Sequence, residues 1–118
     1  MTDYIRLYRE ALGDDWADGL VRYVPDHMID GMVRYITRGQ APAGSFLTAV
    51  LCNDLMGALR RADDTNRDRL WSYGNFLHNY APSDCFGSPA KFKAWVESGG
   101  VEGQRAAAEA GEANHEAG

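Results

Sequence analysis

Apolar residues recur every three or four positions along the first hundred residues, the spacing that places side chains on one face of an α-helix. No segment shows the sustained alternation of apolar and polar residues that is typical of a half-buried strand. The first pattern covers residues 3–12 and ends at Gly13, and the second covers residues 15–24. A third begins at Pro25, a residue common at helix starts, and ends at Gly39, a natural left-handed terminator.

The longest apolar pattern begins at Ser45, whose hydroxyl is suited to cap the first turn of a helix. From Phe46 to Ala62, apolar side chains continue for nearly five turns and form a stripe wider than a surface helix needs. We therefore expect one long helix here, at the centre of a bundle.

Two further helices are predicted after it. Thr65, with an aspartate three residues later, resembles a capping box and predicts a helix to about residue 81. Ser88 followed by Pro89 predicts the start of a short last helix, closed by Gly99 and Gly100. Together the patterns predict an all-α fold, a compact bundle of about five helices with a long central helix.

The C-terminal segment has a different composition from the rest of the chain. Residues 101–118 are mostly Ala, Glu and Gly, with Val101 as the one β-branched apolar residue. Such a segment buries too little surface to offset the entropy lost on ordering. We expect a helical domain over residues 1–100 and a flexible acidic tail over 101–118, disordered or a frayed helix at most.

Charge and composition narrow the class of partner. The tail holds four glutamates and one arginine, and so carries −3 of the chain's net charge of −5. An acidic chain without a basic patch is a poor candidate for binding DNA or RNA. Ten of the 12 basic residues are Arg, which reflects either a high-GC genome or a use for bidentate contacts to carboxylate and phosphate.

No signal segment or membrane-spanning run is recognised, and we expect a cytoplasmic protein with reduced thiols.

The spacing of residues gives little support to a metal site or to a catalytic nucleophile. Residues 64–68 place oxygen ligands as a calcium loop would, but Arg69 and Asn75 occupy the positions that require Gly and Glu. The three histidines match no ligand motif. Cys52 lies in an apolar run, and Cys85 has only His78 as a base that packing could bring near. We predict no catalytic residues, no metal and no cofactor.

Asp54 is the most informative polar residue, because it interrupts the apolar pattern next to the expected core face. A buried carboxylate is costly unless it is paired. One interpretation is an ion pair from Asp54 to an arginine of another helix, Arg34 for example, that sets the helix register. The other is a polar pocket whose wall carries Asn53, Asp54 and Arg61. Arg61 lies two helical turns after Asp54, on the same face.

Two helix starts share a Gly-Ser pair, Gly44-Ser45 and Gly87-Ser88. Free backbone N–H groups at a helix start can accept an anion, and glycine lets a phosphate approach closely. Ordinary capping explains the same pairs. Phe86, in the loop before Gly87, could stack on a base or on a side chain of a partner, or could cover the end of the core. The candidate ligand-binding set is Gly44, Ser45, Asn53, Asp54, Arg61, Asn66, Phe86, Gly87 and Ser88.

Residues 24–99 also resemble a group of short uncharacterised proteins carried by tailed phages and prophages. The resemblance rests on Val24-Pro25-Asp26-His27-Met28, Arg34-Tyr35-Ile36, the stretch from Pro42 to Leu51, Asn53-Asp54-Leu55, Arg61-Ala62-Asp63, Asn66, Phe76-Leu77, and the stretch from Ala81-Pro82 through Cys85-Phe86-Gly87-Ser88. It implies a phage accessory protein acting in the cytoplasm of an infected or lysogenic bacterium. It identifies no site.

Two hypotheses follow for the function. The first is a non-enzymatic accessory protein of counter-defence that binds and sequesters a small anionic, nucleotide-type immune signal. The second is a protein–protein inhibitor or adaptor that blocks a host defence enzyme or complex through its surface. Partners would be a small anionic ligand or a host protein, with no DNA, RNA or membrane, and a homo-oligomer is possible.

Overall fold

Helices joined by short turns make up the chain in the computed structural model, which describes the backbone of residues 3–117 and the side chains of residues 3–111. No strand occurs within residues 3–117, so the predicted all-α class is confirmed. The elements are α1 (Tyr4–Leu12), α2 (Asp14–Tyr23), α3 (Asp26–Arg38), α4 (Ser45–Leu51), α5 (Leu55–Arg61), α6 (Asp64–Asp68), α7 (Leu70–Tyr80), the 3₁₀ turn η1 (Ser83–Cys85), α8 (Pro89–Ser98) and α9 (Gly100–Ala117). The expected number of about five helices was too low.

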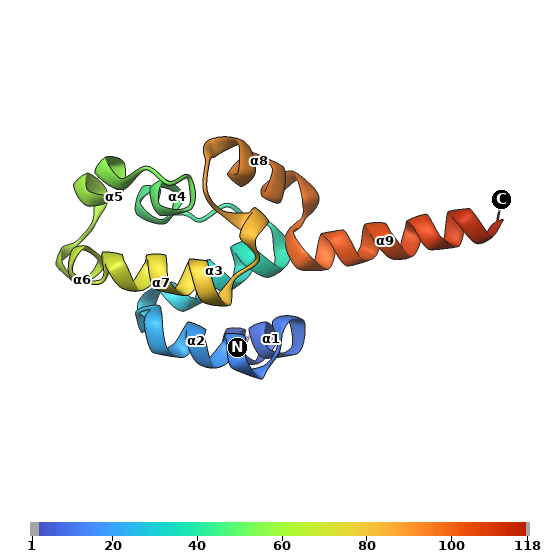
Figure 1. The fold of residues 1–118 in the computed structure, drawn as a ribbon, viewed down its shortest axis with the longest axis horizontal. Helices are drawn as coiled ribbons and strands as arrows, with labels where there is room; N and C mark the ends of the chain where they lie inside the picture. The colour runs from blue at the N-terminus through green and yellow to red at the C-terminus, as the bar shows by residue number, and fades with distance from the viewer. Residues whose placement is uncertain (1–2, 118) are drawn as a thin grey trace.

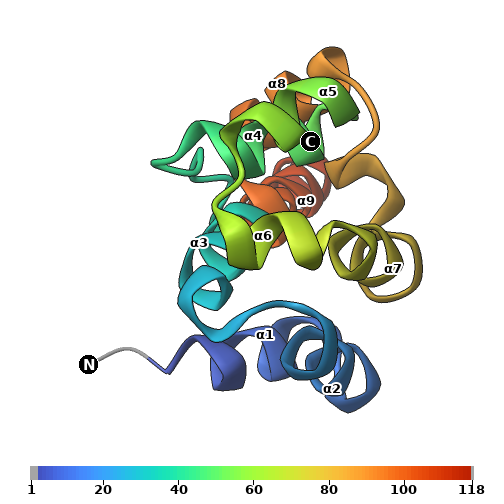
Figure 2. The same ribbon diagram turned by 90° about the vertical axis from the view of Figure 1, so that its left-hand side faces the viewer.

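The helices of the body lie in three tiers (Figure 1). Helices α1 and α2 form one outer tier, α3, α6 and α7 the middle one, and α4, α5 and α8 the other outer tier, and the second view shows the same order (Figure 2). Helix α2 packs on α7, α1 on α2 and α3, and α4 on α5. Helix α9 starts against α3 and α8 and then extends away from the body.

Aromatic rings are the largest fully buried side chains of the core between the tiers. The most deeply buried large side chains include Tyr8, Tyr35, Tyr73, Phe76, Leu20, Met32, Ile36, Leu47 and Leu51. The buried tyrosines also donate hydrogen bonds between elements: Tyr8 to the carbonyl of Tyr80, and Tyr35 to the carbonyl of Cys85 at 2.6 Å. Each large ring thus adds a polar tie between segments far apart in the sequence.

Several predicted helix boundaries are confirmed. Gly13 ends α1, and Gly39 ends α3 in the left-handed conformation with φ 69°. The hydroxyl of Ser88 accepts a hydrogen bond from the Lys91 amide at 3.1 Å, which caps α8 ahead of Pro89. At these positions the local capping chemistry alone is strong enough to define the ends.

The predicted long central helix was wrong. The chain forms α4 and α5 instead, separated at Asn53, which has φ 63°, the left-handed region that Asn tolerates better than most residues. The amide of Asn53 bonds to the carbonyl of Val50 at 3.1 Å, and that of Asp54 to Ala49 at 2.8 Å. This pair of bonds is the Schellman arrangement that terminates helices.

Other expectations need smaller corrections. Ser45 is the first residue of α4 and Gly44 its cap, so the boundary lies one residue earlier than predicted. The helix expected from Thr65 starts at Asp64, is capped by the Asp63 carboxylate, and breaks at Arg69 between α6 and α7. The tail forms helix α9, whose side chains from Ala106 to Gly111 are exposed, and its flexibility stays a prediction. Within residues 3–117, no helix is long and apolar enough to cross a membrane.

Candidate functional site

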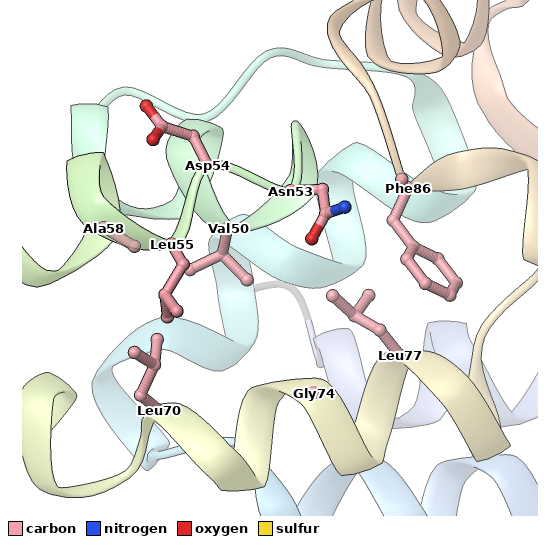
Figure 3. A pocket seen from close by; sticks show the side chains of 10 residues that line it. Val50, Asn53, Asp54, Leu55, Ala58, Leu70, Gly74, Leu77 and Phe86 are labelled. Carbon is pink, nitrogen blue, oxygen red and sulfur yellow. The ribbon is translucent and has the colours of Figure 1, made fainter.

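A cavity of about 260 Å³ lies between α5 and α7, and we call it the α5–α7 cavity. Its wall is mostly aliphatic, with one phenyl ring and one amide. The lining residues are Val50, Asn53, Asp54, Leu55, Ala58, Leu70, Gly74, Leu77, Phe86 and Gly87 (Figure 3). A concave, apolar site with few polar groups is the usual form of a small-ligand pocket.

Asn53 supplies the amide because the turn between α4 and α5 directs it there. Its left-handed backbone ends α4, and its side chain is exposed and points toward the space beside Phe86 and Leu77 (Figure 3). A non-glycine residue held in this conformation is often found where function requires a particular side-chain direction. The carboxylate of the neighbouring Asp54 points away from α7 (Figure 3).

Phe86 reaches the cavity because two hydrogen bonds hold the segment after η1 against the body. Tyr35 of α3 donates to the carbonyl of Cys85, and the amide of Gly87 donates to the carbonyl of Leu51 at 2.9 Å. The half-buried ring of Phe86 therefore stands beside the end of α4. Segments about 35 residues apart in the sequence form this wall together.

A second hollow, of about 580 Å³, lies on the other side of the Asn53–Asp54 turn, and we call it the α4–α5 hollow. It is lined by Pro42, Ala43, Gly44, Ser45, Thr48, Ala49, Cys52, Asp54, Arg61 and Pro89. Asp54 borders both spaces. The structure thus brings Gly44, Ser45, Asp54 and Arg61 together, as a common polar wall requires.

Asp54 is exposed and forms no ion pair with a described arginine, so the interpretation of an ion pair to another helix, such as to Arg34, was wrong. Its carboxylate caps α5 by accepting a hydrogen bond from the Gly57 amide at 2.9 Å. The guanidinium of Arg34 lies over the ring of Tyr4 instead, 5.6 Å from its centre. Within the described side chains, neither Asp54 nor Arg61 forms an ion pair.

Gly57 is the reason Asp54 and Arg61 can both lie over the first turn of α5. A Cβ atom at Gly57 would overlap the Asp54 carboxylate and would lie 2.8 Å from Nη1 of Arg61. The same Nη1 donates to the Gly57 carbonyl at 3.1 Å, and this bond holds the guanidinium at the rim of the α4–α5 hollow. The remaining guanidinium N–H groups have no partner among the described residues.

Asn66 and Ser88 line neither space. Asn66 is buried and accepts a hydrogen bond from the Tyr73 hydroxyl at 2.7 Å, which ties α6 to α7. The Ser88 hydroxyl serves as a cap, and the Gly87 amide is bound to Leu51. The Gly87-Ser88 start is therefore occupied by bonds within the chain, whereas no side chain caps the start of α4.

Neither thiol is arranged as a nucleophile. Cys85 is fully buried, and burial raises its pKa to about 12. Burial, together with the charge of Asp54, also raises the pKa of the Cys52 thiol. Both thiols therefore stay protonated near neutral pH, the unreactive state. Among the described residues, no group of His, Cys, Asp or Glu could hold a metal ion.

The apolar wall of the α5–α7 cavity was not found from the sequence. Leu55, Leu70 and Leu77 fit the helical pattern of core residues, yet Leu55 is 59% exposed. Its neighbour Met56 is 65% exposed, and Trp71, next to Leu70, is 64% exposed. The available signal was the Asn-Asp turn, since a break there rotates the following apolar residues away from the core.

Comparison of the chain with models of protein families, with curated proteins and with solved structures finds no match. The functional argument therefore depends on the geometry of the two spaces and on the side chains that line them.

Proposed function

We propose that this protein binds and sequesters a small, nucleotide-type ligand without transforming it, as a phage accessory protein of counter-defence. The carrying observation is that seven of the nine candidate residues line two neighbouring spaces that share Asp54. These seven come from three separate parts of the sequence. The phage origin is supported only by the resemblance of residues 24–99.

The two spaces differ in chemistry in the way that the two ends of a nucleotide differ. The α5–α7 cavity is apolar with one amide, while the α4–α5 hollow has the hydroxyl of Ser45 and the guanidinium of Arg61 at its rim. Guanidinium and hydroxyl groups are common phosphate partners. The phosphate of a bound ligand would therefore lie on the Arg61 side.

The charge of the hollow limits the charge of the anion that it accepts. Arg61 and Asp54 are the charged residues that line it, and their formal charges cancel. A phosphate monoester or triphosphate would carry excess negative charge past the Asp54 carboxylate. We therefore expect a phosphodiester, such as a cyclic mononucleotide or dinucleotide, to bind more tightly than the matching triphosphate.

Thermal unfolding with a nucleotide panel tests this function. Cyclic mononucleotides, cyclic dinucleotides, ADP-ribose and nucleoside triphosphates are each added to the purified protein in excess. A ligand present at one hundred times its Kd stabilises the folded state by about 2.7 kcal/mol, which raises the Tm by several degrees in a domain of this size. Arg61→Ala should remove the shift, whereas Arg6→Ala, which alters an exposed ion pair on α1, should keep it. No shift with any compound would refute the function.

One observation favours the second function, a surface that blocks a host protein. Leu55, Met56 and Trp71 are large apolar residues that remain mostly exposed, and such residues are enriched in protein interfaces. If this function is correct, Met56→Glu and Trp71→Glu should abolish inhibition of the host target without unfolding the protein, because both side chains are exposed. Val21→Glu is a matched control, because Val21 is an exposed apolar residue of α2, in the opposite outer tier.

A further inference from the structure

Gly74 stands in the middle of α7 without a packing reason for being glycine. Glycine in a helix interior is less favourable than alanine, a cost that is offset where glycine has a steric cause. Gly19 has one, because a Cβ there would overlap the ring of Tyr80, and Gly57 has one in Asp54. A Cβ at Gly74 would meet no atom within 4 Å.

Because of where Gly74 lies on α7, its lack of a side chain leaves space in the α5–α7 cavity. It lies four residues after Leu70 and three before Leu77, so the three share one face of α7, and all line the α5–α7 cavity (Figure 3). Any side chain at position 74 would extend into this space. Gly31 of α3 has similar room, with only Leu47 at 4.0 Å, but it lines none of the spaces described above.

The walls of the cavity accept an uncharged, flat group. Leucine side chains and the Phe86 ring provide apolar contact, and the Asp54 carboxylate points away (Figure 3). The amide of Asn53 provides one donor and one acceptor side by side. Such an amide can pair with the donor and acceptor edge of a heterocyclic base, as Asn does with adenine, and aromatic rings stack on bases of any kind.

The volume limits how much of a ligand can enter. Pockets for whole drug-sized molecules measure about 300–1,000 Å³. At about 260 Å³ the α5–α7 cavity holds one ring system and excludes a complete dinucleotide. The rest of a larger ligand would extend past the Asn53–Asp54 turn toward Arg61.

We propose that the α5–α7 cavity binds the neutral heteroaromatic ring of the ligand, that Asn53 reads its hydrogen-bonding edge, and that Gly74 keeps the space open. This inference rests on the proposed function for the rest of the ligand, but it concerns a part of the site that needs no phosphate. Uncharged nucleosides are therefore suitable probes.

Calorimetric titration of the full chain with adenosine, guanosine, cytidine and uridine tests the inference. At least one nucleoside should bind, and Gly74→Leu should weaken its binding at least tenfold by filling the cavity. Gly74→Ala should weaken it less and raise the Tm, because alanine favours the helix. Gly31→Ala is the matched control, a helical glycine with room for a Cβ, and should raise the Tm while leaving binding unchanged.

The outcomes separate this inference from the proposed function. If a nucleotide binds and Gly74→Leu leaves its affinity unchanged, the function stands and the ring-binding cavity is refuted. If nucleosides bind in the cavity but phosphates add no affinity, the ring site stands and the nucleotide function fails. Absence of binding by all four nucleosides at millimolar concentration overturns the inference. A Gly74→Leu chain that failed to fold would also lose binding. Gly74→Ala adds only one methyl group in open space and should stay folded, so a partial loss of binding in this variant supports the inference independently.

Discussion

Single buried side chains hold segments of this protein together through groups that must stay uncharged. The hydroxyls of Tyr8 and Tyr35 donate to backbone carbonyls on the far side of the core, and Tyr73 donates to Asn66. Burial raises the pKa of each of these tyrosines far above its ordinary value of 10.0. The Cys85 thiol, beside one of these bonds, has its pKa raised from 9.0 to about 12.

These raised pKa values predict that alkali destabilises the fold. Above pH 9 the Cys85 thiol ionises in the unfolded chain and stays protonated in the folded one, so the unfolded state binds fewer protons and the free energy of unfolding falls. Each such group contributes a slope of up to about 1.4 kcal/mol per pH unit, and the tyrosines join above pH 10. Urea unfolding at pH 7 to 11 measures this slope. In Cys85→Ala the decline between pH 9 and 10 should be shallower, because only the raised pKa of Cys52 then contributes there, and an unchanged profile would contradict the assignment.

The conformation of Asn53 allows a separation of its backbone role from its side-chain role. Asn53→Gly should fold at least as stably, because glycine adopts a φ of 63° readily, but it removes the amide from the cavity. Loss of the two hydrogen bonds of this amide, each of about 1 kcal/mol, predicts nucleoside affinity lower by roughly thirtyfold. Asn53→Ala should lose the same affinity and in addition about 1 kcal/mol of stability, since alanine is strained in this conformation. Calorimetry and urea unfolding of both variants check the two effects.

At the scale of the helices, capping residues predicted helix ends correctly. The apolar pattern, in contrast, wrongly predicted that one helix continues through Asn53 and Asp54. Gly13, Gly39 and Ser88 end or begin helices as their local chemistry indicates. Across Asn53 and Asp54, however, leucines and alanines keep the three- and four-residue spacing, so periodicity alone cannot reveal a break. The side-chain chemistry does reveal it, because Asn suits a left-handed end and Asp suits a helix start.

The same break explains which parts of the site were predictable. Asp54 and Arg61 were grouped from the sequence because polar residues amid an apolar stripe are unusual, and Gly44 was added for its Gly-Ser helix start. The three do share a hollow. The α5–α7 cavity was missed because it depends on α5 turning away from the direction of α4, a tertiary property. The apolar spacing alone does not distinguish Leu55, which is exposed at the cavity, from a core leucine.

The cap at Asp54 gives a prediction for α5 itself. Asp54→Ala removes the acceptor for the Gly57 amide and should destabilise the protein by about 1 kcal/mol, the usual value for such a cap. Asp54→Asn keeps an oxygen acceptor and should restore most of the stability. It also removes the negative charge from both spaces, so triphosphates should gain affinity relative to phosphodiesters. Urea unfolding and nucleotide titration of the two variants check this, and equal stability of both would contradict the capping role.

At the scale of the whole molecule, the beginning of α9 belongs to the body while the rest of it does not. Arg105 donates to the carbonyl of Ala11 at the end of α1 at 2.7 Å, and Glu102 pairs with Arg38 of α3 at 3.5 Å. The backbones of Gly39 and Gly100 pack so closely that a Cβ on either would lie under 3.0 Å from the other segment. From Ala106 to Gly111 every side chain is exposed.

This division predicts that the residues after Arg105 contribute almost nothing to the free energy of unfolding. A chain that stops after Arg105 should unfold with the same free energy as the full chain, within about 0.5 kcal/mol, because it removes no side chain seen packed against α1 or α3. A chain that stops after Gly100 loses the contacts of Val101, Glu102 and Arg105 and should be less stable by about 1–3 kcal/mol, most of it from the charged donor to Ala11 and the half-buried valine. Urea unfolding of the three chains, with Arg105→Ala in the full chain as the point variant, measures these differences. A large loss in the chain ending at Arg105 would mean that the last residues pack onto the protein in solution, because an exposed helix end contributes almost nothing to the free energy of unfolding.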